Sequence, residues 1–332
     1  MARKSKWVEI MSPCEPVVDV ARRALGDRLQ LVGRYLSRAS HGAPSDTENV
    51  HQLRVSTRRA VAAMEIFDAL LPERRKRRMT KQLKRVRKAA GAARDLDVML
   101  ARFRPLAEEE ASSSSPAEES PSCLLHALKV HRQRAQDPID KSFEKLGRKE
   151  FRRSVKALVN RVRLRTKDDR LEEPTFADAA QSALEPLVRG FVEAGEADFH
   201  DYTLLHAFRI QGKQLRYAME VFAGAFEPSF REELYPRVAA LQERLGEIND
   251  HATAREIFTL WLAENDIDDL LRGTLEKFVM DENTAVEAKR QEFLDWWTIP
   301  RRDDLRHRFA EALAMDQAEL KPNRSMVLLR AE

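Results

Sequence analysis

Apolar residues recur at intervals of three or four positions along most of this chain, with polar residues between them. The first such segment ends near Ser40 and carries Val17, Val20, Ala24 and Leu31. This period places the apolar residues on one face of an α-helix, whereas a half-buried strand would alternate at every second residue. No segment shows that alternation convincingly, so the pattern predicts an all-α protein.

The same period predicts further helices, separated by short segments rich in Pro, Gly, Ser or acidic residues. They cover residues 47–71, 72–97, 123–136, 138–165, 176–194, 202–225, 228–262, 266–279, 283–297 and 303–314. Each half of the chain therefore supplies about four helices of the length found in bundles. We expect flexible tails at residues 1–15 and 316–332, and a flexible acidic, Ser-rich linker at residues 107–122.

One segment of the chain occurs twice, at an offset of 155 residues. The offset places His51 on His206, Arg54 on Arg209, Arg58 on Lys213, Glu65 on Glu220, Gly91 on Gly246 and Asp95 on Asp250. A match of this length without a gap indicates an internal repeat.

The repeated segment is predicted to be a helix with two different faces. At about 100° per residue, His51, Arg54 and Arg58 share a polar sector, and Met64 and Phe67 share an apolar sector. A basic face on a single helix is usually only solvated. Repetition of the pattern His-x-x-Arg-x-x-x-(Arg/Lys) instead favours a ligand shared by both copies.

The predicted helix over 72–97 holds the densest positive charge in the chain. One sector of about 80° contains Arg74, Arg78, Lys81, Arg85 and Lys88, opposite an apolar stripe. The helix over 138–165 likewise presents Arg152 and Lys156 opposite Phe151 and Leu158. These faces are consistent with a cationic wall, and equally with a nucleic-acid patch or a solvated surface.

The glycines and aspartates of the repeat are predicted to have structural roles. Gly91 and Gly246 lack a side chain where another helix could approach closely. Asp95 and Asp250 are expected to hydrogen-bond or pair with a His or Arg of the preceding helix, because carboxylates facing a polyanion would repel it.

Charge is distributed unevenly, although the net charge is only +4. Residues 51–104 hold 16 Lys and Arg against 5 Asp and Glu, whereas the residues after 170 hold 19 against 32. The basic first half favours a polyanionic partner, and the acidic second half is compatible with a protein partner. Two cysteines exclude a disulfide framework, and no apolar run is long enough to span a membrane, so we expect a cytoplasmic protein.

Sequence motifs of common enzymes and metal sites are missing. The chain contains no phosphate-binding Gly-x-x-x-x-Gly-Lys-(Ser/Thr) loop, no dinucleotide-binding Gly motif, no His-Glu-x-x-His and no Cys-x-x-Cys. We therefore expect no catalytic residue, no cofactor and no metal ion.

The motifs HQLRVSTRRAVAAMEIF with GAARDLDV, and HAFRIQGKQLRYAMEVF with LGEINDHA, closely resemble those of the CHAD domain, the conserved histidine α-helical domain. The resemblance covers about residues 16–315. It implies two antiparallel four-helix bundles, residues 16–165 and 174–315, related by a pseudo-twofold axis around a basic cavity or groove. It also implies binding of inorganic polyphosphate and association with polyphosphate granules.

The family's motif residues correspond to His51, Arg54, Arg58 and Arg59 in the first copy and to His206, Arg209, Lys213 and Arg216 in the second. Val61 departs from the pattern, since the family often has Arg there, and Gln214 stands opposite Arg59. Some relatives carry a triphosphatase domain with a Glu-x-Glu-x-Lys signature. This signature is missing here, so the resemblance implies a stand-alone binding module.

We therefore predict a non-catalytic polyphosphate-binding protein, in which phosphate or sulfate ions could replace the ligand. The predicted binding residues are the motif residues above together with Arg74, Arg78, Lys81, Arg85, Lys88, Arg152 and Lys156. One alternative is RNA or DNA binding, although Phe103 is the only aromatic residue between 73 and 104 on which a base could stack. Another is an enzyme that processes a phosphate chain, with His51 or His206 as phosphoacceptor.

Overall fold

The computed structural model describes residues 6–41, 47–111, 121–165, 173–264, 267–316 and Leu320. Within these ranges the chain is helical and forms no strand, apart from one isolated bridge between Pro16 and Thr175. This confirms the all-α class that the apolar period predicts.

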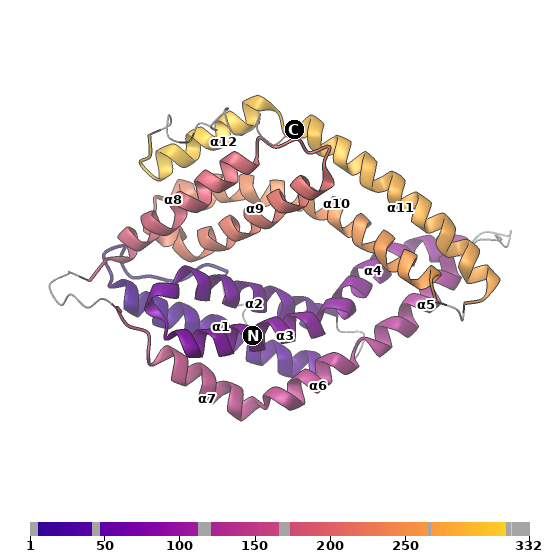
Figure 1. The fold of residues 1–332 in the computed structure, drawn as a ribbon, viewed down its shortest axis with the longest axis horizontal. Coiled ribbons are helices and arrows are strands. Elements are labelled where there is room, and N and C mark those ends of the chain that lie inside the picture. The colour runs from indigo at the N-terminus through magenta and orange to yellow at the C-terminus, as the bar shows by residue number, and fades with distance from the viewer. Residues whose placement is uncertain are drawn as a thin grey trace.

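The helices fall into two sets, one in each half of the chain (Figure 1). The first set is α1 (Val17–His41), α2 (Thr47–Ile66), α3 (Glu73–Ala89), α4 (Gly91–Ala111), α5 (Pro121–Arg134), α6 (Asp137–Leu146) and α7 (Arg148–Val159). The second set is α8 (Phe176–Ala194), α9 (Tyr202–Phe222), α10 (Tyr235–Leu262), α11 (Asp269–Trp296) and α12 (Ile299–Ala312). A π-turn over Phe230–Leu234 leads directly into α10.

Several predicted boundaries are wrong. The helix predicted over 138–165 is interrupted at Gly147, whose φ of 60° is a left-handed conformation that a side chain disfavours. The pattern over 72–97 is divided at Ala90 into α3 and α4. In the second half, residues 266–297 were predicted as two helices, but α11 is continuous because no helix breaker lies between residues 279 and 283.

The predicted linker and C-terminal tail are only partly described. Residues 107–111 belong to α4 and residues 121–122 to α5, so helix replaces the start and the end of the predicted linker. Residues 112–120 lie outside the described chain. Of the predicted tail over 316–332, only Asp316 and Leu320 are described, and Leu320 is buried.

Helix packing follows the sequence repeat. α1 packs on α2 as α8 packs on α9, α4 packs on α5 as α10 packs on α11, and α1 packs on α7 as α8 packs on α12. Both halves therefore use the same pairs of neighbours, in the same order along the chain.

The two halves are not separate bundles. α2 contacts α9, while α4 and α5 pack against α10 and α11, so one group of four helices takes two from each half (Figure 1). Phe103 of α4 lies in this group, with ring centroids 5.7 Å from Phe258 of α10 and 5.0 Å from Phe278 of α11. The two predicted bundles, residues 16–165 and 174–315, therefore share this aromatic core.

An N-terminal strap, residues 6–15, crosses from one half to the other. The Phe176 amide donates to the Glu15 carbonyl at 2.8 Å, and the Val8 amide donates to the Glu220 carbonyl at 3.3 Å. The Trp7 ring lies edge-on to Tyr235, with centroids 4.7 Å apart. Residues 6–15 are thus not the flexible tail that we predicted, because backbone groups of the strap and the Trp7 ring find partners on the second half.

We predict that Trp7→Ala lowers the free energy of unfolding by about 1–3 kcal/mol, because it removes a half-buried aromatic contact between the strap and Tyr235. Trp7→Phe keeps an aromatic ring there and should lose less. Denaturant unfolding of both variants tests this prediction. If Trp7→Ala had the same free energy of unfolding as the wild type, the strap would not hold the two halves together.

Candidate functional site

The two copies of the histidine-bearing helix contact each other, since α2 packs against α9. Their cationic faces meet around Lys213. Burial lowers the pKa of Lys213 to about 7, and the positive charges of Arg209, Arg58 and Arg216 contribute to the decrease. We refer to Arg54, Arg58, Arg209 and Lys213 as the α2–α9 cluster.

Every member of the α2–α9 cluster is partly shielded from solvent. Burial lowers the pKa of Arg209, as does nearby Arg58, although Asp250 acts in the opposite direction. Burial also lowers the pKa of Arg54, and Arg58 adds to this effect. The Nε atom of Arg58 is buried and has no hydrogen-bond partner among the described residues. The cluster therefore concentrates positive charge where water solvates it poorly.

Asp95 and Asp250 are the acidic residues beside the α2–α9 cluster. An Oδ1 of Asp95 lies 3.5 Å from Nη2 of Arg54, on the preceding α2. Burial raises the pKa of Asp95, and the charge of Asp250 adds to the increase, although Arg54 opposes it. Two carboxylates oppose four cations, so the net charge of the site remains positive.

The two repeated glycines have different surroundings. A Cβ atom on Gly91 would lie 3.1 Å from Nη1 of Arg54, so this glycine makes room for a guanidinium rather than for another helix backbone. A Cβ atom on Gly246 would have no described atom within 4 Å. The prediction that another helix approaches Gly246 closely is thus wrong. Arg209, the counterpart of Arg54, instead donates through Nε to the Leu245 carbonyl at 3.1 Å.

The two repeated histidines also differ. His51 is half-buried and lines a cavity of about 1250 Å³ beneath the N-terminal strap, together with Arg58. His206 is exposed at the surface of α9, with its ring centroid 6.5 Å from that of Tyr202. Of the two histidines, only His51 lines this cavity, and Arg58 is the cluster residue that lines it as well.

Glu220 is the buried centre of a second charged network. Its carboxylate accepts hydrogen bonds from Arg59 Nε at 2.6 Å, from Arg216 Nη1 at 3.0 Å and from the Tyr235 hydroxyl at 2.8 Å. Burial alone would raise the pKa of Glu220, but Arg59, Arg216 and Arg28 hold it below its usual value. Arg28 is itself 6% exposed, and burial lowers its pKa to about 10.

This network explains where the two sequence copies differ. Arg59 and Arg216 both bind Glu220, and their repeat counterparts are Gln214 and Val61, which have no comparable carboxylate to neutralise. The counterpart of Glu220 is Glu65, which is exposed. Arg59 and Arg216, predicted as ligand contacts, thus primarily hold a buried carboxylate, although both also line the cavity beneath the strap.

The predicted cations of α3 lie on the surface. Arg74, Arg78, Lys81, Arg85 and Lys88 are all exposed, and no ion pair joins them to another described residue. On the same helix, the positive charge of Arg87 contributes to the lowered pKa of Arg54 in the α2–α9 cluster. This contribution is smaller than those of burial and of the nearer charges. The stripe is therefore available to solution along the length of α3.

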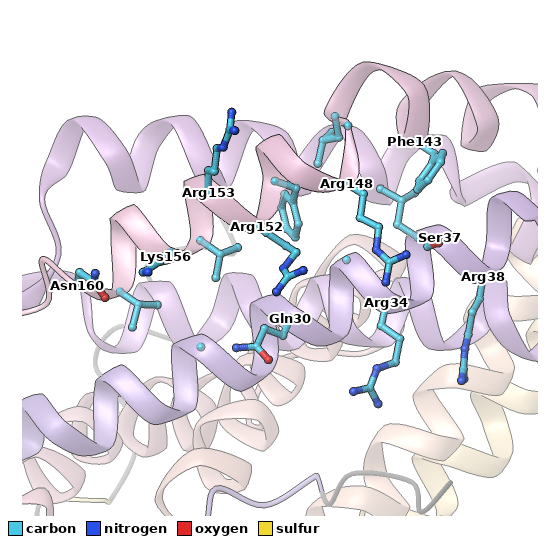
Figure 2. Close-up of a pocket in the computed structure, with 18 residues that line it drawn as sticks. Gln30, Arg34, Ser37, Arg38, Phe143, Arg148, Arg152, Arg153, Lys156 and Asn160 are labelled. Atoms are coloured by element: carbon cyan, nitrogen blue, oxygen red, sulfur yellow. The ribbon is translucent and has the colours of Figure 1, made fainter.

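Arg152 and Lys156 belong to a different site. They lie on α7, in a groove against α1 that also contains Arg34 and Arg38 (Figure 2). The predicted single track of cations is thus distributed over the α2–α9 cluster, the α3 stripe and this α1–α7 groove.

The sequence reasoning missed Arg28, Tyr235 and Arg34. Arg28 had a detectable signal, because it falls on the apolar stripe of its helix beside Leu25 and Val32, where a charged residue needs a partner. Tyr235 and Arg34 had no such signal in the sequence, because the residues that they face are distant along the chain.

The described residues contain neither a group of side chains arranged to hold a metal ion nor a helix that could cross a membrane. No three His, Cys, Asp or Glu side chains converge in a way that could hold a metal ion. No helix in the described ranges combines the length and the apolar character needed to cross a membrane.

Comparison with known proteins identifies similarity in sequence and in fold. The CHAD domain family profile matches residues 20–259. The crystal structure of the CHAD domain from the plant Ricinus communis is similar over 87% of this chain and 96% of its own, with 20% identity and a TM-score of 0.63. PptA from Streptomyces chartreusis is similar over 85% and 99%, with 19% identity and a TM-score of 0.61. No curated protein matches the chain.

Glu220→Gln is expected to destabilise the protein by about 3 kcal/mol, since removal of one partner leaves buried cations without compensation. Glu65→Gln is the matched control, because it changes the same residue type at the equivalent, exposed position and should shift stability by less than about 0.5 kcal/mol. Urea unfolding of the two variants makes the comparison. Equal effects would mean that the network around Glu220 does not stabilise the fold.

Proposed function

Since the chain belongs to the CHAD domain family, which is associated with binding of polyphosphate or triphosphate, we propose that it binds inorganic polyphosphate without turning it over. The observation that supports this proposal most strongly is the α2–α9 cluster. Its four cations come from both copies of the repeat, are poorly solvated and outnumber the adjacent carboxylates.

The chemistry of the cluster fits a linear phosphate chain. Each internal phosphate carries about one negative charge and offers only oxygen acceptors, which arginine can bind through two N–H groups and lysine as a point charge. Burial is the main cause of the lowered pKa of Lys213, and an anion in the cluster would offset the repulsion that adds to it. The exposed cations of α3 would extend the contact along the chain. We infer a cytoplasmic location, on polyphosphate granules.

Nucleic acid is the second candidate ligand, because its phosphodiester backbone also carries one negative charge per phosphate. Sequence-tolerant binding of single strands uses aromatic side chains on which bases stack. The α3 stripe has no aromatic residue in its helix, which favours inorganic polyphosphate. Release of orthophosphate by the purified protein would contradict the non-catalytic part of the proposal.

The first test compares polyphosphate binding by the wild type and Arg58→Gln/Lys213→Gln. We expect the variant to bind at least about tenfold more weakly, and the slope of log affinity against log salt to fall by about 1 for each cation removed. Arg75→Gln/Arg77→Gln removes the same charge from exposed positions of α3 outside the stripe and should have a much smaller effect. Equal weakening in both variants, or preferential binding of RNA at equal charge, would indicate a nonspecific polyanion surface.

The second test uses the pKa of about 7 at Lys213. Bound polyphosphate favours the charged amine, so binding takes up a proton and affinity should fall as the pH rises from about 6 to about 8.5. Lys213→Arg keeps the charge at every pH in this range and should reduce the dependence. Titrations of polyphosphate into both proteins, at pH of about 6 and about 8.5, measure this pH dependence of affinity. The same pH dependence in both proteins would exclude Lys213 as its source.

A further inference from the structure

The α1–α7 groove is a cleft of about 910 Å³ with cationic rims and an apolar floor. Its lining residues include no Asp or Glu. The cations of the rims are Arg34 and Arg38 on α1 and Arg148, Arg152 and Lys156 on α7. Figure 2 shows Arg148 and Arg152 extending from α7 toward α1, whereas Arg153 points away from the groove.

The floor consists mainly of side chains that water solvates poorly. They are Leu36 from α1, Phe143 and Leu146 from α6, and Phe151 and Val155 from α7. The ring of Phe151 packs so closely on α1 that a Cβ atom at Gly33 would lie 3.1 Å from it. Leu36, Leu146, Phe151 and Val155 are buried, so the apolar surface open to a ligand is that of the half-buried Phe143 and Val159. A ligand that covered these two side chains would gain from apolar contact as well as from charge.

The rim cations lack carboxylate partners. Within the described chain, no ion pair involves Arg34, Arg38, Arg148, Arg152 or Lys156; Arg38 only lies over the Tyr35 ring, at 5.9 Å from its centroid. On α7 these cations recur every four residues, a spacing at which like charges on a helix repel each other. Acidic side chains of a ligand placed along the rims would relieve this repulsion.

The equivalent surface in the second half provides an internal comparison. There α8 packs on α12 as α1 packs on α7. The counterpart of Arg34 is Arg189, which donates to Glu185 at 2.9 Å, and the first half has Gln30 in place of that glutamate.

Three of the four arginines of α12 are also paired with carboxylates. Arg302 lies 2.9 Å from Glu196 and Arg308 lies 3.0 Å from Asp304. One copy of the surface thus neutralises its cations with its own carboxylates, while the other copy leaves them available.

We propose that the α1–α7 groove binds an acidic amphipathic helix of a partner protein. A phosphate chain has no apolar atoms with which to cover the floor, whereas an amphipathic helix places leucine or phenylalanine there and glutamate or aspartate against both rims. The rim from Arg148 to Lys156 rises about 12 Å along α7, just over two helical turns. A partner helix of about three turns, with apolar residues every three or four positions, fits this length.

The proposal is independent of polyphosphate binding in the α2–α9 cluster, because it uses residues outside that cluster and another ligand chemistry. Its probe is a fluorescent helical peptide of about three turns with leucine on one face and glutamate on both flanks. A peptide of the same composition, scrambled so that no apolar face forms, is the control ligand. Full-length wild type is compared with Arg34→Gln/Arg152→Gln and with the charge-matched Arg75→Gln/Arg77→Gln.

We expect the amphipathic peptide to bind wild type at least about tenfold more tightly than the scrambled peptide, and Arg34→Gln/Arg152→Gln to weaken it at least about tenfold. The matched variant should change the affinity less than about twofold. Phe143→Ser, at a half-buried floor position, should weaken the amphipathic peptide without affecting the scrambled one.

Three results would overturn the proposal: equal binding of the two peptides, an unchanged affinity in the groove variant, or displacement of the peptide by polyphosphate or RNA at equal charge. The last result would make the groove part of a general polyanion surface. Loss of polyphosphate binding in Arg58→Gln/Lys213→Gln, with binding of the amphipathic peptide retained, keeps the two sites distinguishable.

Discussion

The buried carboxylate of Glu220 is the constraint on which the arrangement of the two halves depends. It accepts hydrogen bonds from Arg59 of α2, from Arg216 of its own helix and from Tyr235 at the start of α10. The Glu220 carbonyl also receives the Val8 amide of the strap. A buried charge is tolerated only when it is well paired. Satisfying Glu220 therefore holds α2 against α9, and this contact brings the cationic faces of both copies together.

Duplicated residues have acquired different roles in the two copies. Glu220 is buried while Glu65 is exposed, and Gly91 makes room for a guanidinium while Gly246 borders open space. At the surface, no ion pair within the described chain involves the rim cations of the α1–α7 groove, whereas α8 and α12 pair most of their arginines with carboxylates. The excess of positive charge in the first half of the sequence thus corresponds to particular sites rather than to a uniformly basic surface.

The polarity of the surroundings separates the two basic sites. In the α2–α9 cluster, cations from two helices repel one another in a poorly solvated space, which suits a ligand of high charge density and no apolar surface. The α1–α7 groove has its charges on exposed rims and places apolar side chains between them. Charge alone would assign both sites to one ligand, whereas the floor of the groove favours a ligand that is both acidic and apolar.

The sequence by itself determined the all-α class, the internal repeat and the family, because helical period and motif spacing are encoded within a few turns of chain. Only the tertiary structure decided which cations share a site. Arg59 and Glu220 are 161 residues apart, and nothing near either residue indicates the pairing. Likewise, the period of α7 predicted a basic face with Arg152 and Lys156 but not the α1 residues opposite them. Such neighbours depend on how distant helices pack, a choice set by the fit of whole apolar faces and by buried charges that must be paired.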